Sequence, residues 1–353
     1  MKTIVKKVFF FYKLSLFIIF ISCSSDGASN PLNNTPYNID INTQIIGQST
    51  TYPNGDGTGI VNFTISATNA TSYKILVGSE IINSSTGFFS FTFNDLGTNS
   101  YSIIASAYNG DNFISTNKTI VVYVAPTLVW FDEFNNNGVL DATKWNYETG
   151  AGGWGNNELQ YYTARSENVT VQDGVLKINI IKELYNGSNY TSARIVTKDK
   201  YSFKYGKVEM RAKLPSGAGT WPALWMLGNN ISSVSWPACG EIDIMEHVGN
   251  QLNKIYGTLH HPGHFGGTAD GGNTTISNAT TEFHIYSIDW TSSYIKFYVD
   301  NQLFYTFTNN SSLPFNQNFF FIFNCAMGGN FGGTVDPNFT LATFEVDYVR
   351  VYQ

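Results

Sequence analysis

Apolar and polar residues alternate along much of this 353-residue chain in the way typical of β-strands. In KVEMRAKL (207–214) every second residue is apolar and those between are charged, and YIKFYVD (294–300) alternates similarly. A period of two gives each strand one face for the core and one for solvent. No convincing amphipathic helix appears from Thr127 onward. The pattern therefore predicts an all-β fold, with antiparallel sheets packed as a sandwich.

Residues 37–125 show a denser rhythm of short strand patterns, separated by turn clusters such as NGDG and NGDN. Strands at this spacing over about ninety residues predict an immunoglobulin-like β-sandwich, which resembles PKD-type modules. No tryptophan or acidic pair accompanies these strands, so we expect a spacer rather than a glycan-binding module. Pro126 marks the boundary, and residues 127–353 form the second predicted domain.

The N-terminus carries lysines followed by the uncharged run LSLFIIFIS (14–22). Nine such residues are too few to span a bilayer, so residues 1–22 are predicted to be a cleaved signal. The sequence at Ser22-Cys23 resembles a bacterial lipoprotein processing site, with Cys23 as the lipidated residue. Residues 23–36 would be a flexible tether. We expect a lipid-anchored protein of the cell surface or outer membrane; the alternative is an ordinary secretion signal.

The composition and net charge of the chain argue against some classes of function. Charged residues make up 13% of the chain, about half the usual share. A net charge of −6 without a basic cluster beyond the N-terminus argues against nucleic-acid binding. Three cysteines cannot build a disulfide framework, so the fold must be held by its core. We expect Cys239 and Cys325 to be buried or half-buried thiols; a bridge between them is the alternative.

Three carboxylates lie close together in GEIDIMEHVG (240–249). Glu241 and Asp243 alternate with isoleucines and so share the polar face of a strand. Glu246 has the wrong parity for that face, and a one-residue bulge near Met245 is required to bring it there.

Carboxylates on one face repel each other, and at least one should hold its proton above its usual pKa. Glycosidic bond cleavage needs one ionised and one protonated carboxyl, which are about 5 Å apart in retaining enzymes. Asp243 would lie between the two glutamates and hold the nucleophile by a shared proton. Taken alone, the decapeptide also fits a solvated acidic strand or a calcium site.

GEIDIMEHVG resembles the signature of glycoside hydrolase family 16 in its bulged E-x-D-x-x-E form. Residues 128–353 also resemble bacterial laminarinases, which are endo-β-1,3-glucanases, in GWGNNELQYYT (153–163), YGKVEMRAKLP (205–215) and GTWPALWMLG (219–228). The resemblance implies a β-jelly roll whose concave sheet carries the acids in a long cleft. It also implies that Glu241 is the nucleophile, Glu246 the acid/base and Asp243 their assistant.

The resemblance further implies a set of sugar contacts. Trp221 and Trp225 would stack beside the nucleophile, Trp236 further along the cleft. Asn156 and Arg194 would bind sugar hydroxyls, and His260 would donate to a glucose or an acid. Core packing is the alternative for the tryptophans, and ion pairing is the alternative for Arg194.

Two neighbouring features do not belong to the predicted site. Glu158 has the same ambiguity as Arg194 and is not among the predicted site residues. HHPGH (260–264) suggests a metal, but Pro262 and Gly263 make it a loop, and no nearby cysteine completes a zinc set. We therefore expect His247, His261, His264 and His284 to be loop or structural residues.

A structural calcium ion on the convex side is also implied, held by Glu133, the carbonyl of Gly174 and Asp347. It would stabilise the fold and take no part in catalysis, which would need no cofactor.

Together these features predict a monomeric, retaining endo-β-1,3-glucanase acting on β-glucan, with the lipid anchor as its only membrane contact. One alternative is hydrolysis of another β-glycan, such as mixed-linkage glucan or an agar- or carrageenan-type galactan. The other is a catalytically silent surface protein that binds glycans.

Overall fold

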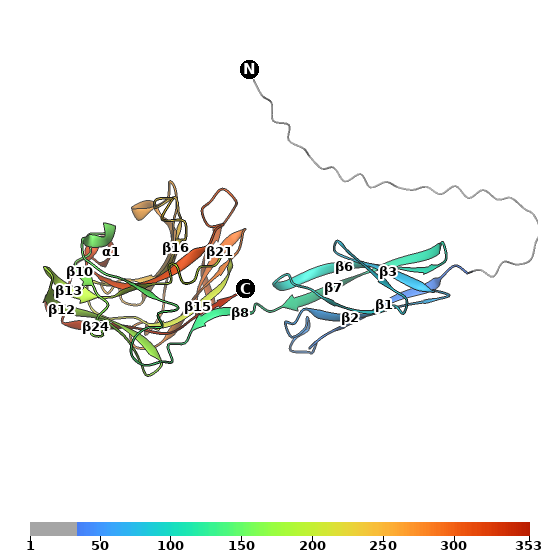
Figure 1. The fold of residues 1–353 in the computed structure, drawn as a ribbon, viewed down its shortest axis with the longest axis horizontal. Coiled ribbons are helices and arrows are strands. Elements are labelled where there is room, and N and C mark those ends of the chain that lie inside the picture. The colour runs from blue at the N-terminus through green and yellow to red at the C-terminus, as the bar shows by residue number, and fades with distance from the viewer. Residues whose placement is uncertain (1–33) are drawn as a thin grey trace, which may run out of the picture. The chain divides into compact units, whose positions relative to one another are not determined.

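The computed structural model describes residues 34–353 (Figure 1). The predicted signal (1–22), Cys23 and most of the tether lie outside the described residues. Within residues 34–353, no helix has both the length and the apolar character needed to cross a membrane. The described chain forms two compact units, of which the larger contains Val121–Gln353 and the smaller contains Val61–Phe91 and Ser100–Ile120.

The first seven strands form two sheets. One has the order β1-β2-β5 and the other β4-β3-β6-β7. Buried residues alternate with exposed ones along β2 and β6, so each sheet has one dry face, as in a β-sandwich. The PKD-type character of this module and the boundary at residues 125–127 remain predictions. The strands are β1 (Tyr37–Ile45), β2 (Ile60–Thr68), β3 (Ser72–Val77), β4 (Glu80–Ser84), β5 (Phe88–Thr92), β6 (Gly97–Asn109) and β7 (Asn112–Val124).

One of the two sheets of the larger unit has ten strands. Its main path runs β10-β13-β12-β24-β15-β20-β21-β22, while β11 pairs with β12 and β8 with β24. The strands are β8 (Leu128–Asp132), β10 (Gln160–Tyr162), β11 (Val169–Gln172), β12 (Val175–Tyr185), β13 (Ser188–Ser192), β15 (Gly206–Lys213), β20 (His284–Trp290), β21 (Tyr294–Val299), β22 (Gln302–Thr308) and β24 (Leu341–Tyr352).

A seven-stranded sheet carries the acidic stretch, in the order β19-β18-β17-β16-β23-β14-β9. Its strands are β9 (Asn146–Glu148), β14 (Arg194–Val196), β16 (Thr220–Gly228), β17 (Glu241–His247), β18 (Lys254–His260), β19 (Asp270–Thr275) and β23 (Phe319–Met327). The helical elements of the described chain are short: η1 (Gly153–Gly155), η2 (Gly266–Thr268) and α1 (Gly329–Gly332).

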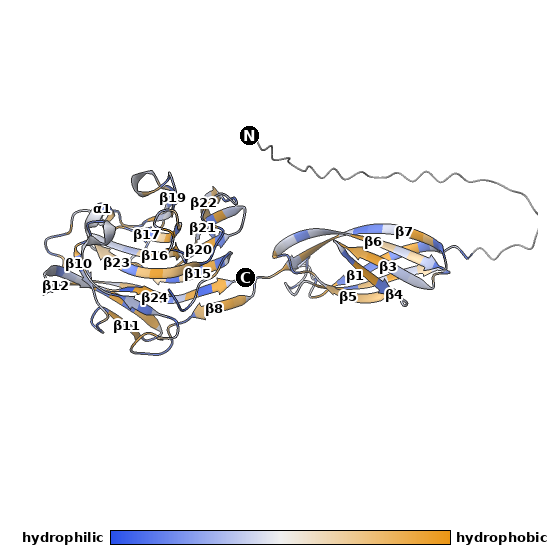
Figure 2. Ribbon diagram, turned by 45° about the horizontal axis from the view of Figure 1, so that its top comes forward, coloured by the Kyte–Doolittle hydropathy of each residue, from blue (hydrophilic) through white to orange (hydrophobic). Residues whose placement is uncertain are grey.

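The core of the larger unit lies between these two sheets. On β15 the residues Val208, Met210 and Ala212 are fully buried, which confirms the alternation seen in the sequence. The central strand β23 is buried at every position. Apolar and polar residues are mixed along the strands rather than separated into whole strands (Figure 2). The all-β jelly-roll prediction is confirmed.

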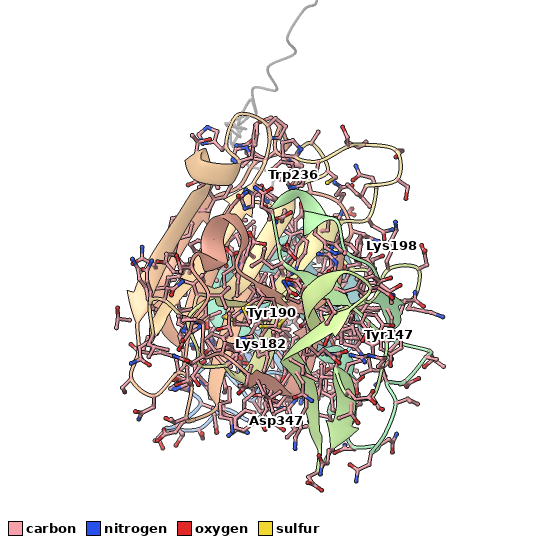
Figure 3. All side chains as sticks on the ribbon, turned by 90° about the vertical axis from the view of Figure 1, so that its left-hand side faces the viewer. Tyr147, Lys182, Tyr190, Lys198, Trp236 and Asp347 are labelled. Carbon is pink, nitrogen blue, oxygen red and sulfur yellow. The ribbon has the colours of Figure 1, made fainter. Side chains whose placement is uncertain are left out.

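Both ends of the larger unit carry predicted functional residues. Trp236 lies near the top of the view in Figure 3, whereas Asp347 of β24 lies near the bottom. One residue predicted to bind sugar and one predicted to bind calcium therefore lie at opposite ends of the unit.

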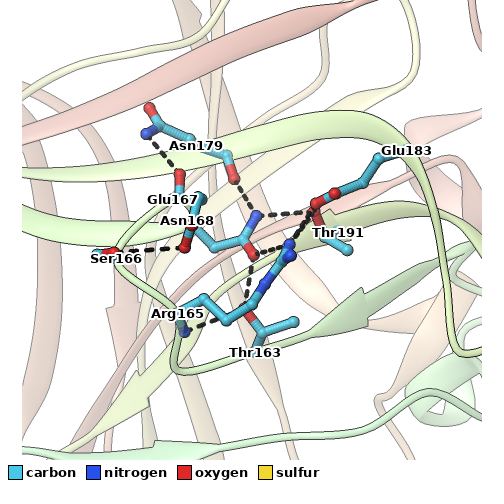
Figure 4. Close-up of polar contacts among 8 residues, drawn as sticks. All are labelled: Thr163, Arg165, Ser166, Glu167, Asn168, Asn179, Glu183 and Thr191. Atoms are coloured by element: carbon cyan, nitrogen blue, oxygen red, sulfur yellow. Dashed lines mark hydrogen bonds and ion pairs between the residues drawn. The ribbon is translucent and has the colours of Figure 1, made fainter.

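A polar network holds the loop after β10 against β12 and β13 (Figure 4). The Arg165 guanidinium contacts the Glu183 carboxylate of β12 and donates to Asn168 Oδ1 at 2.9 Å. Asn168 Nδ2 donates to Thr191 Oγ1 of β13 at 2.9 Å, and Thr163 Oγ1 donates to Asn168 Oδ1 at 2.6 Å. These side-chain hydrogen bonds hold the loop that begins at Thr163 in place, and with it the end of the preceding stretch 153–163.

Candidate active site

The acidic strand β17 contains a bulge. On β18, Asp243 lies opposite Thr258 but Glu246 lies opposite Tyr256, so the register shifts by one residue between them. The pairing with β16 shifts at the same place. Met245 and the two isoleucines of the strand are buried in the core, and the extra residue returns Glu246 to the face of the other acids. The bulge predicted near Met245 is confirmed.

Glu241 lies at the start of β17, between an indole and an imidazole. Trp236 Nε1 donates to Glu241 Oε2 at 2.9 Å. His260 Nε2 lies 3.5 Å from Glu241 Oε1 and 3.3 Å from Asp243 Oδ2. His260 is directly opposite Glu241 in the pairing of β17 with β18, which explains why its ring reaches both acids.

Glu246 has a separate set of partners. Trp221 Nε1 donates to Glu246 Oε1 at 3.0 Å, and Thr258 Oγ1 donates to Glu246 Oε2 at 2.9 Å. Trp236, which was predicted to lie further along the cleft, is therefore next to Glu241. The stacking of Trp221 and Trp225 beside the nucleophile remains a prediction. Trp236 belongs to the loop that enters β17, whereas Trp221 is the second residue of β16 and lies beside the end of β17.

The three carboxyls have raised pKa values. Burial, then repulsion from Asp243, raises the pKa of Glu241 well above its usual value. Burial, then the charge of Glu246, does the same for the pKa of Asp243, whose residue is only 3% exposed. Burial also raises the pKa of Glu246, against the hydrogen bonds from Thr258 and Trp221. The cluster therefore keeps protons at a pH where isolated carboxyls have lost them.

Arg194 of β14 is oriented by a carboxylate and two aromatic rings. Its Nε donates to Glu148 Oε2 of β9 at 2.5 Å. The guanidinium carbon lies 4.9 Å from the ring centre of Trp154 and 4.8 Å from that of Trp225. The ion pair considered from the sequence is present, and its partner Glu148 was not identified there. Sugar binding by Arg194 and Trp225 remains a prediction.

Asn156 and Glu158 belong to one hydrogen-bonded group. Asn156 Nδ2 lies 3.4 Å from Glu158 Oε1, and Tyr162 donates to Glu158 Oε2 at 2.9 Å. The Tyr162 hydroxyl accepts from Asn324 Nδ2 at 2.9 Å, and Asn324 Oδ1 accepts from the Trp225 indole at 2.7 Å. Glu158 thus joins the 153–163 stretch to a tryptophan of the predicted site, a role the sequence analysis missed.

Two cysteines and one histidine near the acids are buried. Cys239 and Cys325 are free and buried, as predicted. His247 is fully buried, and burial lowers the pKa of its imidazole to about 4, so it is neutral at pH 7.

The residues predicted to hold calcium have arginine partners. Glu133 accepts from Arg350 Nε at 2.7 Å and from Arg350 Nη2 at 2.8 Å, and Asp347 pairs with Arg211. Gly174 forms the turn between β11 and β12 with a φ of 76°. Two carboxylates and a carbonyl are ligands that suit calcium. Calcium binding at these residues remains a prediction, and the ion would have to share both carboxylates with guanidinium groups.

A β-sandwich whose bulged strand presents two buried carboxyls and one partly buried carboxyl on one face has the groups that glycosidic bond cleavage needs. Residues 156–350 match the family model described as glycosyl hydrolases family 16, and the chain belongs to this family.

Three comparisons with known proteins agree with this membership. The chain is 49% identical over 242 residues to a β-glucanase of Rhodothermus marinus, covering 64% of this chain and 85% of the relative. It is 43% identical to glucan endo-1,3-beta-glucosidase A1 of Niallia circulans, covering 64% of this chain and 38% of that protein. The X-ray structure of the laminarinase from Rhodothermus marinus covers 64% of this chain and 96% of its own, with a TM-score of 0.62 and 49% identity.

Proposed function

We propose that this family 16 glycoside hydrolase is a retaining endo-hydrolase of β-1,3-glucan. The observation that carries the proposal is the bulge on β17, which gives Glu241 and Glu246 a common face but separate hydrogen-bond partners. Two different carboxylate environments are what assign two different roles in glycoside hydrolysis. The similarity to a laminarinase and to a glucan endo-1,3-beta-glucosidase supports the substrate.

The proposed reaction is a double displacement. Glu246 protonates the glycosidic oxygen while the Glu241 carboxylate attacks the anomeric carbon, forming a glycosyl-enzyme. Glu246 then removes a proton from water, which hydrolyses the intermediate and restores both acids. The pKa values of both glutamates are raised, so the roles rest on the resemblance to the family and not on these shifts. A proton on Asp243 would let that residue donate to Glu241 as the latter ionises.

The sugar contacts are part of the same proposal. Trp221, Trp225 and Trp236 would stack on the apolar faces of β-linked glucose rings. Trp236 is 41% exposed while its indole N–H donates to Glu241, so its ring is available beside the nucleophile. Asn156, Arg194 and His260 would bind sugar hydroxyls.

The substrate proposal is tested by reducing-end release from laminarin, barley mixed-linkage glucan and agarose, with products sized over time. We expect rapid release of mixed short oligosaccharides from laminarin and weaker action on barley glucan. Activity on agarose alone would overturn the substrate and keep the acids. Binding of laminarin without any new reducing ends would replace hydrolysis with the glycan-binding alternative.

Two further proposals concern the whole chain. We infer that Cys23 is lipidated and anchors the enzyme, so Cys23→Ser should move the protein from the membrane fraction to the soluble fraction. An unchanged distribution would leave secretion or another anchor as the explanation. We also infer a structural calcium ion at Glu133, Gly174 and Asp347, on the grounds of the oxygen donors there.

A further inference from the structure

A second cluster of ionisable side chains lies on the loop between β18 and β19. His261 Nε2 is 2.8 Å from Asp270 Oδ2, and His264 Nδ1 is 3.2 Å from the same oxygen. The three atoms all lie within 4.8 Å of one another. The two imidazole rings are stacked, with centres 4.8 Å apart.

The backbone brings these three residues together. His261 and His264 exchange two backbone hydrogen bonds of 2.9 Å, which close the tight turn through Pro262 and Gly263. Asp270 begins β19 and pairs with Leu259 near the end of β18, so it returns beside the turn. The motif HHPGH offered three histidines and no cysteine, but the third member of this cluster is a carboxylate six residues after His264.

Two imidazole nitrogens and one carboxylate oxygen form a typical three-residue set for zinc, with water as the fourth ligand. Zinc binds such atoms at about 2.0 to 2.2 Å, so donors that all lie within 4.8 Å of one another need only small movements to reach one ion. We propose that His261, His264 and Asp270 bind a late first-row divalent cation, for which Zn²⁺ is the probe.

The burial of the three side chains suits a preorganised site with an open side. The His261 side chain is 7% exposed and its ring packs against those of Phe307 and Phe315, at 5.8 and 5.6 Å between centres. The His264 side chain is 53% exposed and that of Asp270 is 30% exposed. One ligand is therefore held by the core, while the cation and its water reach the other two from solvent.

The metal would hold the loop between β18 and β19, and this loop also contacts two side chains that lie beside Glu241. The backbone N–H of Gly266 donates to His260 Nδ1 at 3.1 Å, and the Phe265 ring lies 5.4 Å from that of Trp236. His260 and Trp236 are the two side chains beside Glu241. Metal binding at this loop therefore stabilises the surroundings of Glu241, although the site itself does not depend on glucan hydrolysis.

The test is titration of ZnCl₂ into the full chain, followed by calorimetry, thermal unfolding and amide exchange, all without substrate. We expect one zinc per chain, a higher Tm and slower exchange in residues 261–270. His264→Ala and Asp270→Asn should each weaken binding at least tenfold and lose the gain in Tm. Circular dichroism of both variants verifies that they fold.

Two controls make the assignment specific. Glu241→Gln should bind zinc as the wild type does, which separates this cluster from the acids near His260. His284→Ala removes an imidazole that pairs with Asp300 elsewhere, at 2.7 Å, and should also leave zinc binding unchanged. Wild-type affinity in His264→Ala, loss of binding in Glu241→Gln, or no binding at millimolar zinc would each overturn the proposal.

Discussion

At the scale of single residues, Glu241 and Glu246 differ in the groups that surround them. Glu241 is next to His260, a second carboxyl and the Trp236 indole. Glu246 accepts hydrogen bonds on both of its oxygens. Because their surroundings differ, replacing Glu241 or Glu246 by glutamine should change the activity in different ways.

We expect Glu241→Gln to lose at least about 10³-fold in turnover on every substrate, since no covalent intermediate can form. Glu246→Gln should lose as much on laminarin but retain cleavage of an aryl β-glucoside oligomer, whose leaving group needs no proton. Azide should speed only the second variant, by replacing water as the nucleophile. The measurement is aryl release with and without azide, and rescue of Glu241→Gln alone would reverse the two roles.

Asp243→Asn tests the electrostatic strain in the cluster. The folded-state pKa of Asp243 is raised, so between pH 4 and that pKa the folded protein binds more protons than the unfolded chain. Stability of the wild type therefore falls as pH rises through this window. The asparagine variant should have the higher Tm at pH 7, by about 3 °C for each kcal/mol regained, and no advantage below about pH 4.

Glu183→Gln should change Tm in the opposite direction when it is measured over the same range of pH. Hydrogen bonds from Arg165 and Thr191 lower the pKa of Glu183, so its stabilising effect is present at neutral pH and lost in acid. This variant should have a lower Tm than the wild type at pH 7, with the difference shrinking as pH falls. Equal pH profiles for the Asp243 and Glu183 variants would contradict the origin given for both shifts.

At the scale of strands, register places distant polar side chains in one row across the seven-stranded sheet. Glu148 pairs with Arg194, and Arg194 pairs with Asn324. Asn324 lies opposite Ala223, which in turn lies opposite Glu246. The row leads from the edge strand β9 to the proposed acid/base, which makes Glu148 a positioning residue for Arg194.

Glu148→Gln should therefore raise the KM for laminarin oligosaccharides about fivefold, which corresponds to about 1 kcal/mol for a partly exposed ion pair. The kcat should change less than twofold, because Arg194 is proposed to bind sugar hydroxyls and not to take part in breaking the bond. Steady-state kinetics on oligosaccharides of defined length provide the measurement. Glu183→Gln breaks an arginine pair in the other sheet and should leave KM unchanged; an equal rise there would point to a general loss of stability.

The strand pattern and the bulge could be predicted because both depend on residues close in sequence. Parity alone shows that Glu246 needs an extra residue before it, and β17 contains that residue. The partners of Glu241, Arg194 and His264 could not be predicted in this way. Trp236, Glu148 and Asp270 reach them through loop paths and strand order, which local alternation does not encode.

At the scale of the molecule, the matched region and the N-terminal module should be separable. The laminarinase structure from Rhodothermus marinus is covered over 96% of its length by 64% of this chain. We expect a protein of residues 127–353 to fold alone and to hydrolyse soluble laminarin within about twofold of the kcat/KM of the full chain. A large loss, with retained folding by circular dichroism, would assign the N-terminal module a part in substrate binding.

Calcium should act on stability rather than on turnover. After chelation and dialysis, adding calcium should raise Tm in proportion to the logarithm of its concentration above Kd. Asp347→Asn should lose this gain while keeping laminarin hydrolysis. Asp300→Asn, at a carboxylate paired with His284, is the matched control and should keep it. The same rise in Asp347→Asn as in the wild type would place the ion elsewhere.

The central strand β23 has a consequence for the chain before it folds. Its sequence FFFIFNCAM has no charge, proline or glycine, and the native sheet hides all nine residues from solvent. Segments of this kind readily form intermolecular β-structure when they are exposed. Until β14 and β16 pair with it, this strand is open to intermolecular pairing, so high protein concentration during refolding favours precipitation over the native enzyme.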